Sequence, residues 1–411
     1  MRIKRGSVAL LLVLSSLLGF ASRASATDVS SESALRTAWA DASETSVTLT
    51  SDIAIACPAS PIIRNSATAI TLNGNGHKVT GCPGADLFRT DTLNGNMTLT
   101  DVTIDGGDVA VEGAGTSTIT TDHVTFTHQT GVAMRTDVGD ISISDTTAED
   151  VFGVLLSNTG DVTITASHLH HLTGTTAVQE FSGDTLVMTD SSIDDAPHGA
   201  INGHGDVSVV RSSITNVGGT GAVGMDGGSM IFVNSTLANG QQSLVYSDTG
   251  SITFIYSTVT TTVDGSPVFG IDFALTSFGS VIAGAGGGAP ACDPQTKAPT
   301  VTSQYSWDDD GSCGFADATD HSDAGDPGLA ALAAATNGTL ARTPNSGSPL
   351  LDKIVASACP DGIRAITVDQ LSNPRPSNGA CDIGAIEVQV APPPAETPPA
   401  APVAVQPTFT G

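Results

Sequence analysis

Residues 160–169 read GDVTITASHL, and residues 205–214 read GDVSVVRSSI. In both stretches a Gly-Asp turn precedes a short segment of alternating apolar and polar residues. A second apolar residue then follows five positions after the first, as Leu169 follows Ile164 and Ile214 follows Val209. A period of two is typical of a β-strand, because successive side chains point to opposite faces. The two stretches are therefore predicted to be equivalent parts of a repeat.

The same pattern recurs along much of the chain. Small turn residues stand at Gly139, Gly160, Gly183, Gly205, Gly227 and Thr249, in steps of 21 to 23 residues. The apolar pairs are Leu99 with Ile104, Ile119 with Val124, Ile143 with Ala148, Ile164 with Leu169, Met188 with Ile193, Val209 with Ile214, Phe232 with Leu237 and Phe254 with Val259. A fixed period of this kind indicates a solenoid, and short strands without helical spacing indicate a parallel β-helix. We expect residues 45–290 to form the coils, with Met188 and Val209 on one core ladder.

Two other repeat folds fit less well. A leucine-rich repeat needs an L-x-x-L-x-L ladder with Asn, and a calcium-binding nonapeptide roll needs GGxGxD repeats; neither motif is present.

Polar residues mark the turns of the predicted coils. One set stands three positions before the second apolar residue of a pair and consists of Asp101, Asp145, Asp190, Arg211 and Asn234. The other set stands two positions before it and consists of Asp122, Thr146, Ser167, Ser191, Ser212, Ser235 and Ser257. We interpret both sets as stacked polar groups that satisfy the backbone at a turn.

Charge and composition exclude several classes of protein. The chain of 411 residues has a net charge of -27, and its first 26 residues hold four basic groups and no acid. A nucleic-acid binder with a basic groove is excluded, because phosphate contacts need clustered Lys and Arg. With 39% hydrophobic residues the chain is able to form a core, and its 45 glycines follow no collagen period.

The N-terminus has the three parts of a secretory signal peptide, which we assign to residues 1–26. Residues 1–5 are basic, residues 8–20 are apolar, and residues 24–26 read Ala-Ser-Ala. An apolar stretch of that length is too short to span a bilayer, and no later segment qualifies. The mature chain is therefore expected to begin near Thr27 and to be secreted or held at the cell surface.

Six cysteines in an exported chain predict disulfides. They are Cys57, Cys82, Cys292, Cys313, Cys359 and Cys381. Six cysteines allow 15 pairings, but consecutive cysteines are 25, 21 and 22 positions apart, which is close to one coil. Sequential pairing is therefore expected. No CxxC pair is present, which argues against a zinc or redox motif of that type.

The ends of the solenoid are predicted to be covered, since end coils expose open strand edges. Residues 27–44 contain a candidate capping helix, in which one face is formed by Ala34, Leu35, Ala38, Trp39 and Ala42. Residues 291–390 read as loop-rich closing coils. Residues 391–411 hold seven prolines and read as an extended tail.

The closing segment resembles a known family. Residues 307–314 read WDDDGSCG, residues 324–329 AGDPGL, residues 347–352 GSPLLD, residues 374–376 PRP and residues 379–387 GACDIGAIE. Together they are similar to the end of choice-of-anchor Q domain proteins of bacteria. The resemblance implies an all-β fold, a right-handed single-stranded parallel β-helix of the pectate-lyase-like type with a short N-terminal capping helix. It supplies no catalytic residues.

An enzyme of that fold would be a polysaccharide lyase or a glycoside hydrolase. Asp194-Asp195 and Gly203-His204-Gly205 superficially resemble polygalacturonase motifs. Asp195 and His204 are only nine residues apart, under half a coil, and are therefore expected to point from different faces. His123, His128, His198 and His204 are interpreted as surface residues.

A candidate cation- or ligand-binding face follows from aligning the coils on the second apolar residue. The next two residues are then Asp105-Gly106, Thr125-Phe126, Glu149-Asp150, His170-His171, Asp194-Asp195 and Thr215-Asn216. Glu149, Asp150, His170, His171, Asp194 and Asp195 should share one outer face on three adjacent coils. The alternatives are a calcium or zinc site, a pH-sensitive patch or a solvated turn face.

The sequence Asp308-Asp309-Asp310-Gly311 partly imitates a calcium loop, but Ser306 replaces the first carboxylate, so a solvated loop is expected.

Two functional hypotheses remain. The first is a non-enzymatic exported β-helix that binds a glycan or a surface protein. The alternative is a polysaccharide lyase or glycoside hydrolase. No Lys or Arg occupies the candidate ladder positions, and lyase chemistry needs such a base, so the binding role is favoured.

Overall fold

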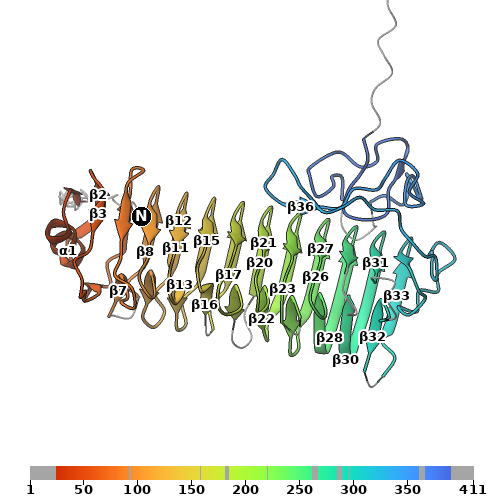
Figure 1. Cartoon of the computed structure of the whole chain (residues 1–411), viewed down its shortest axis with the longest axis horizontal. Coiled ribbons are helices and arrows are strands. Elements are labelled where there is room, and N and C mark those ends of the chain that lie inside the picture. The colour runs from red at the N-terminus through yellow and green to blue at the C-terminus, as the bar shows by residue number, and fades with distance from the viewer. Residues whose placement is uncertain are drawn as a thin grey trace, which may run out of the picture.

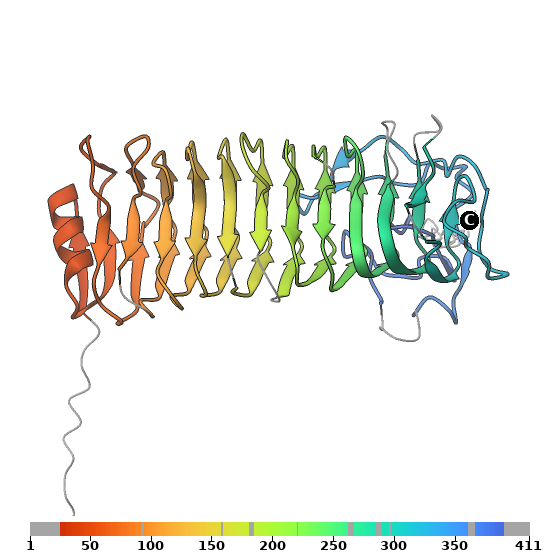
Figure 2. The ribbon, with the colours of Figure 1, turned by 90° about the horizontal axis from the view of Figure 1, so that it is seen from below.

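The computed structural model describes residues 25–91, 94–157, 159–180, 185–219, 221–261, 267–284, 289–295, 297–360 and 366–389. Residues 1–24 of the predicted signal peptide and the predicted tail from residue 391 lie outside these ranges. The chain forms a long solenoid, with helix α1 (Glu32–Ala40) at one end and C-terminal residues folded over one side of the other end (Figures 1 and 2). The predicted all-β parallel β-helix with a short N-terminal helix is confirmed.

A full coil contributes three strands, and equivalent strands of successive coils pair in parallel. The first stack is β4 (Ile62–Arg64), β7 (Phe88–Thr90), β10 (Val111–Gly113), β13 (Val132–Thr136), β16 (Gly153–Ser157), β19 (Val178–Glu180), β22 (Ile201–Gly203), β25 (Val223–Met225), the first halves of β28 (Val245–Ile255) and β30 (Val268–Phe278), and β32 (Cys292–Pro294). The second stack is β1 (Ser25–Val29), β2 (Glu44–Leu49), β5 (Ile70–Asn73), β8 (Met97–Thr100), β11 (Ile119–Asp122), β14 (Ile141–Ser144), β17 (Val162–Thr165), β20 (Thr185–Thr189), β23 (Asp206–Val210), β26 (Ser229–Val233), the second halves of β28 and β30, and β33 (Thr300–Gln304).

The third stack forms a separate twelve-stranded sheet. Its members are β3 (Ile53–Ala54), β6 (Lys78–Thr80), β9 (Thr103–Asp105), β12 (Thr125–Thr127), β15 (Thr147–Glu149), β18 (His168–His170), β21 (Ser192–Asp194), β24 (Ser213–Thr215), β27 (Thr236–Ala238), β29 (Thr258–Thr260), β31 (Val281–Ala283) and β34 (Trp307–Asp308). Two short antiparallel pairs follow, β35 (Ala333–Ala334) with β36 (Leu340–Ala341) and β37 (Ile354–Val355) with β38 (Ala380–Cys381).

The core consists of ladders of inward side chains. Met188 pairs with Val209 in register, as the repeat predicts, and both are fully buried. One coil departs from the predicted alignment. Thr121, not Ile119, is the partner of Leu99, and Phe126, not Val124, stacks on Ile104. Ile119 and Thr121 both face the core, and the hydroxyl groups of Thr121 and Thr146 lie 3.0 Å apart, which lets a polar residue occupy a core position.

The turn between the second and third strands is the most regular feature of the coils. Its first residue has a φ of 44° to 54° at Asp101, His123, Asp145, Ala166, Asp190, Arg211, Asn234 and Tyr256. The next residue points inward, and in six successive coils the hydroxyl of this residue accepts a hydrogen bond from the backbone N–H of the same position one coil earlier. The accepting residues are Ser167, Ser191, Ser212, Ser235, Ser257 and Ser280.

Each of these serine hydroxyls also donates to the carbonyl two residues before it, so both backbone groups at the turn are satisfied. The hydroxyl ladder is thereby confirmed from Thr146 onward. The prediction that Asp122 belongs to the ladder is wrong, because the observed alignment of this coil is shifted by two residues from the predicted one. Val124 occupies the ladder position instead.

Helix α1 lies against the first coils through one buried face. Leu35 and Trp39 are fully buried, and the Trp39 ring lies 4.8 Å from that of Phe88. Arg64 of β4 lies at the C-terminal end of the helix. Its buried guanidinium donates to the carbonyls of Trp39, Asp41 and Glu44 at 2.8 to 3.1 Å. A side-chain cation thus satisfies carbonyls at the end of the helix and just beyond it.

The C-terminal cover, residues 326–360 and 366–389, lies on the outer face of the third stack near its far end (Figure 1). Its Ala385 backbone donates to Thr258 of β29, and Leu340 of β36 donates to Ser213 of β24. Strands β24, β27, β29 and β31 are consequently buried on both faces, whereas β9, β12, β15 and β18 keep partly exposed outward residues.

Three disulfides cross-link the described part of the chain. They join Cys57 to Cys82, Cys292 to Cys313 and Cys359 to Cys381, so the sequential pairing predicted from the spacing is confirmed. The first two bridges lie near the two ends of the solenoid, and the third lies in the C-terminal cover. Among the described residues, no helix is long and apolar enough to cross a membrane.

Candidate functional site

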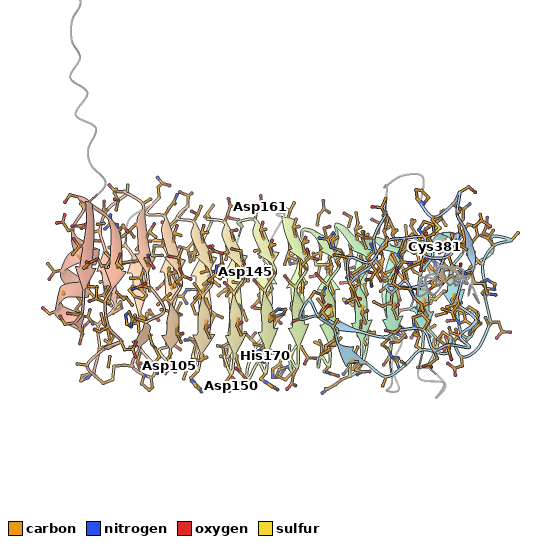
Figure 3. All side chains as sticks on the ribbon, turned by 90° about the horizontal axis from the view of Figure 1, so that it is seen from above. Asp105, Asp145, Asp150, Asp161, His170 and Cys381 are labelled. Carbon is orange, nitrogen blue, oxygen red and sulfur yellow. A yellow bond between two sulfur atoms is a disulfide. The ribbon has the colours of Figure 1, made fainter. Side chains whose placement is uncertain are left out.

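The predicted acid–imidazole face lies where the third strand of each coil ends. Figure 3 shows Asp105, Asp150 and His170 along one edge of the solenoid, away from Asp161. The sequence alignment of this face is wrong in one coil: Thr127 and His128, not Thr125 and Phe126, follow Asp105. Phe126 is a buried core residue, and His128 Nδ1 lies 2.9 Å from Asp105 Oδ1.

Only part of the predicted face converges. Glu149 of β15 and His170 of β18 are register partners, and His171 follows with a φ of 52°. His170 Nδ1 lies 3.2 Å from His171 Nδ1, and the two nitrogens lie 3.9 Å and 3.7 Å from Glu149 Oε1. Asp195 approaches from the next coil, with Oδ2 3.8 Å from His171 Nε2.

The other two predicted residues do not join this cluster. Asp194 accepts hydrogen bonds from Thr215 Oγ1 at 2.6 Å and Asn216 Nδ2 at 2.7 Å, which turns its carboxylate toward the following coil. Asp150 has the same positive φ as His171 and Asp195 but does not contribute a ligand atom to the cluster of Glu149, His170 and His171. The face is therefore divided into a Glu149–His170–His171 group and a hydrogen-bonded Asp194.

A second feature is a groove on the outer face of the first stack, over β22, β25 and β28. Asn202, Gly224 and Tyr246 occupy the same outward position in these strands and are register partners. The groove has a volume of about 240 Å³, and its walls include Thr176, His198, Asn202, Asp226 and Tyr246. Gly224 opens its floor, because a Cβ built there would meet only Tyr246 Cδ1, at 3.8 Å.

Ionisable groups stack along one rim of this groove. His204, Asp226 and Asp248 follow β22, β25 and the first half of β28 at intervals of 22 residues. His204 Nδ1 lies 3.6 Å from Asp226 Oδ2, and the Tyr246 hydroxyl donates to Asp248 Oδ1. That hydrogen bond to a carboxylate raises the pKa of Tyr246 to about 12, so its phenol stays protonated and uncharged.

The repeat pattern does not predict this groove. From the sequence, His198 and His204 are interpreted as separate surface residues, and the predicted coils are aligned on their second and third strands rather than on the first. The signal was nevertheless present, because His204, Asp226 and Asp248 recur at the period of the repeat. Asn202 and Tyr246 would then have fallen two positions before His204 and Asp248.

The acidic segment Asp308–Asp310, which begins at the end of β34, is not the solvated loop that was expected. Asp308 is fully buried, and Asp309 is half-buried, with Oδ2 accepting from Gly284 N at 2.9 Å. Asp308 Oδ2 accepts from Cys313 N at 2.9 Å, and Asp310 Oδ2 accepts from Ala291 N at 3.0 Å. The carboxylates of this segment therefore point toward the solenoid, where they accept hydrogen bonds from backbone N–H groups of the last coils.

No protein-family model and no curated protein sequence matches the chain. Among solved structures, one described as L. reuters 100-23 SRRP aligns with 69% of this chain and 94% of its own length, at 12% identity and a TM-score of 0.39. A likeness this distant does not bear on function.

Proposed function

We propose that this protein is an exported, non-enzymatic binding module that takes a neutral glycan in the groove over β22, β25 and β28. The single observation that carries the proposal is the row Asn202–Gly224–Tyr246, which sets an amide and an aromatic ring on either side of a position without a side chain. A sugar ring offers an apolar face and a rim of hydroxyls. An aromatic ring and an amide are matched to those two features.

The other groove residues support the same ligand class. Asp226 and His198 are exposed and offer a carboxylate and an imidazole, and Thr176 offers a hydroxyl. A volume of about 240 Å³ is below the roughly 300–1,000 Å³ of pockets for drug-sized ligands, so one sugar unit of a longer chain is expected to occupy it. The net charge of -27 disfavours anionic polymers, because like charges repel.

Export is supported by the three disulfides, which persist in oxidising compartments, and by the signal-like residues 1–26. Membership of the choice-of-anchor Q family is supported by its closing motif. Arg375 of PRP, and Asp382 and Glu387 of GACDIGAIE, are buried together in the C-terminal cover.

Glycan binding is tested by glycan-array screening and calorimetry with the mature chain and two variants. Gly224→Val fills the floor of the groove without backbone strain and should abolish binding with little change in melting temperature. Thr163→Val, on the outer face of β17 in the second stack, is the matched control and should bind as the wild type does. Equal glycan profiles for the wild type and Gly224→Val would refute the groove as the binding site.

Hydrolysis of a polysaccharide is the second candidate, because Asp226 and Asp248 occupy equivalent positions on adjacent coils. Most glycoside hydrolases use a pair of carboxylates. Release of reducing ends by the wild type, and its loss in Asp226→Asn, would establish this activity. A bound glycan that stays intact over the same period would leave binding as the function.

A further inference from the structure

Outside the groove, two imidazoles and a carboxylate converge on the outer edge of the third stack. Glu149 and His170 point outward from β15 and β18, which pair in register, so one coil spacing separates their Cα atoms. His171 lies one residue further, where the chain turns with a φ of 52° and brings its ring beside that of His170. One ligand atom from each residue lies within 4.8 Å of the other two.

The three atoms have the separations of metal ligands. Around a tetrahedral zinc ion, ligand atoms about 2.0–2.1 Å from the metal lie about 3.3 Å from one another. Here His170 Nδ1 and His171 Nδ1 are 3.2 Å apart, and Glu149 Oε1 is 3.7 Å and 3.9 Å from them. Movements of a few tenths of an ångström would bring the triangle to the ideal size, and all three side chains are 29% to 58% exposed and free to adjust.

We propose that Glu149, His170 and His171 bind a divalent transition metal of the zinc class, with an open coordination position facing solvent. Two imidazole nitrogens and one carboxylate oxygen suit zinc, copper or nickel, whereas calcium takes six to eight oxygens. Three protein ligands leave a fourth tetrahedral position for water or a partner's side chain. The net charge of -27 raises the local concentration of cations around the chain.

Asp195 serves as an orienting residue rather than a ligand. Its Oδ2 lies 3.8 Å from Nε2 of His171, the nitrogen that would not coordinate, and a movement of about 0.8 Å would bring the two atoms to hydrogen-bond distance. A carboxylate beside the second nitrogen fixes the ring and the tautomer of a ligating histidine, and removing such a partner typically lowers metal affinity 10- to 100-fold. Asp194 is excluded, because Thr215 and Asn216 already engage its carboxylate.

The test uses the mature, untagged chain after removal of metal with EDTA. Zinc affinity is measured by competition with a chromogenic chelator, and cobalt(II) serves as a spectroscopic probe of tetrahedral coordination. The wild type should bind one zinc ion and develop the visible cobalt spectrum. His170→Ala, Glu149→Gln and His171→Asn should each lower the zinc affinity at least tenfold; Asn is used because it tolerates the positive φ. Asp195→Asn should cause a smaller loss.

The controls are variants at the other imidazole–carboxylate contacts. His123→Ala changes the neighbouring Asp122–His123–Asp145 cluster, and His128→Ala changes the pair with Asp105. Both should bind zinc as the wild type does, with unchanged circular dichroism in all variants. The proposal is overturned if zinc does not bind, if His170→Ala and His171→Asn bind normally, if His123→Ala removes binding, or if a hundredfold excess of calcium displaces the zinc.

Discussion

The guanidinium of Arg375 lies 2.9 Å from the carboxylate of Glu387, and neither side chain is more than 1% exposed. Arg375 also donates to the carbonyls of Asp382 and Gly384 and stacks 4.3 Å above the ring of Tyr256, a residue of the solenoid. The Tyr256 hydroxyl in turn donates to Cys359 O of the cover. The pair therefore holds the C-terminal cover together at the point where it meets the coils.

Arg375→Met should destabilise the cover by about 3–5 kcal/mol, because it leaves the Glu387 carboxylate buried without a countercharge. Urea unfolding followed by tryptophan fluorescence checks this, since Trp307 lies among the residues that pack against the cover. Limited proteolysis should also cut the variant within residues 326–389 before the solenoid is cut.

A double variant separates the pair from its surroundings. Arg375→Met with Glu387→Gln removes both charges and should cost less than the two single changes added together. Strict additivity would show that the two residues do not interact.

The serine ladder is expected to be worth about 1–3 kcal/mol per rung. Ser212 Oγ donates to Val210 O at 2.8 Å and accepts from Ser191 N at 3.1 Å, and it is fully buried. Ser212→Ala should lower the free energy of unfolding by that amount, because it leaves the buried Ser191 N–H without this acceptor and removes one of the two hydrogen bonds to the Val210 carbonyl. Ser208→Ala, on the partly exposed outward face of β23, is the matched control and should change it by less than about 0.5 kcal/mol. Equal effects would contradict the role of the ladder.

The parts of the structure that the sequence predicted are those that repeat. The 22-residue period governs the second and third strands, the core ladders, the hydroxyl ladder and the disulfides. It is visible in the spacing of successive apolar pairs, such as Ile164 with Leu169. The predicted alignment was wrong in one coil because Ile119 and Val124 have the same spacing as a true pair, while Thr121, the register partner of Leu99, is polar.

Features that do not repeat could not be predicted in this way. The contact between Tyr256 and Cys359 spans 103 residues and has no periodic signature. In the candidate site, the sequence placed six residues on one face, but hydrogen bonds from Thr215 and Asn216 withdraw Asp194 from it. The groove depends on a missing side chain at Gly224, which the hydrophobic pattern does not register.

Arg64 gives a prediction about the N-terminal end. Its guanidinium is fully buried and donates to the carbonyls of Trp39, Asp41, Glu44 and Thr68. Arg64→Met keeps the apolar stem but removes one hydrogen bond from each of these carbonyls, and should lower the free energy of unfolding by about 2–4 kcal/mol. Hydrogen exchange should show the loss first in α1. Arg36→Met is the matched control because its guanidinium is partly exposed, and an equal loss of protection in both variants would contradict a special role for Arg64.

The buried acid Asp308 predicts a pH dependence. Burial, together with the neighbouring Asp310 carboxylate, raises the pKa of Asp308 to about 7, from an ordinary value near 4. Between about pH 4 and pH 7 the folded protein therefore holds a proton that the unfolded chain has released. The contribution of this group to the free energy of unfolding is largest at low pH and falls as the pH rises through that window.

Asp308→Asn isolates this contribution from that of the other carboxylates. The amide is a neutral analogue of the protonated acid. Asp308 Oδ1 and Oδ2 accept from Asp310 N and Cys313 N, and an amide keeps only one acceptor oxygen, but that loss is the same at every pH. The free energy of unfolding of the variant, relative to that of the wild type, should therefore rise between pH 4 and pH 7 and level off above about pH 8. Asp317→Asn, in an exposed loop, is the control and should show no such rise, because the pKa of Asp317 is lowered by hydrogen bonds from Thr319. Urea unfolding at several pH values measures the difference. A constant difference between Asp308→Asn and the wild type across that range would mean that Asp308 is ionised in the folded protein throughout.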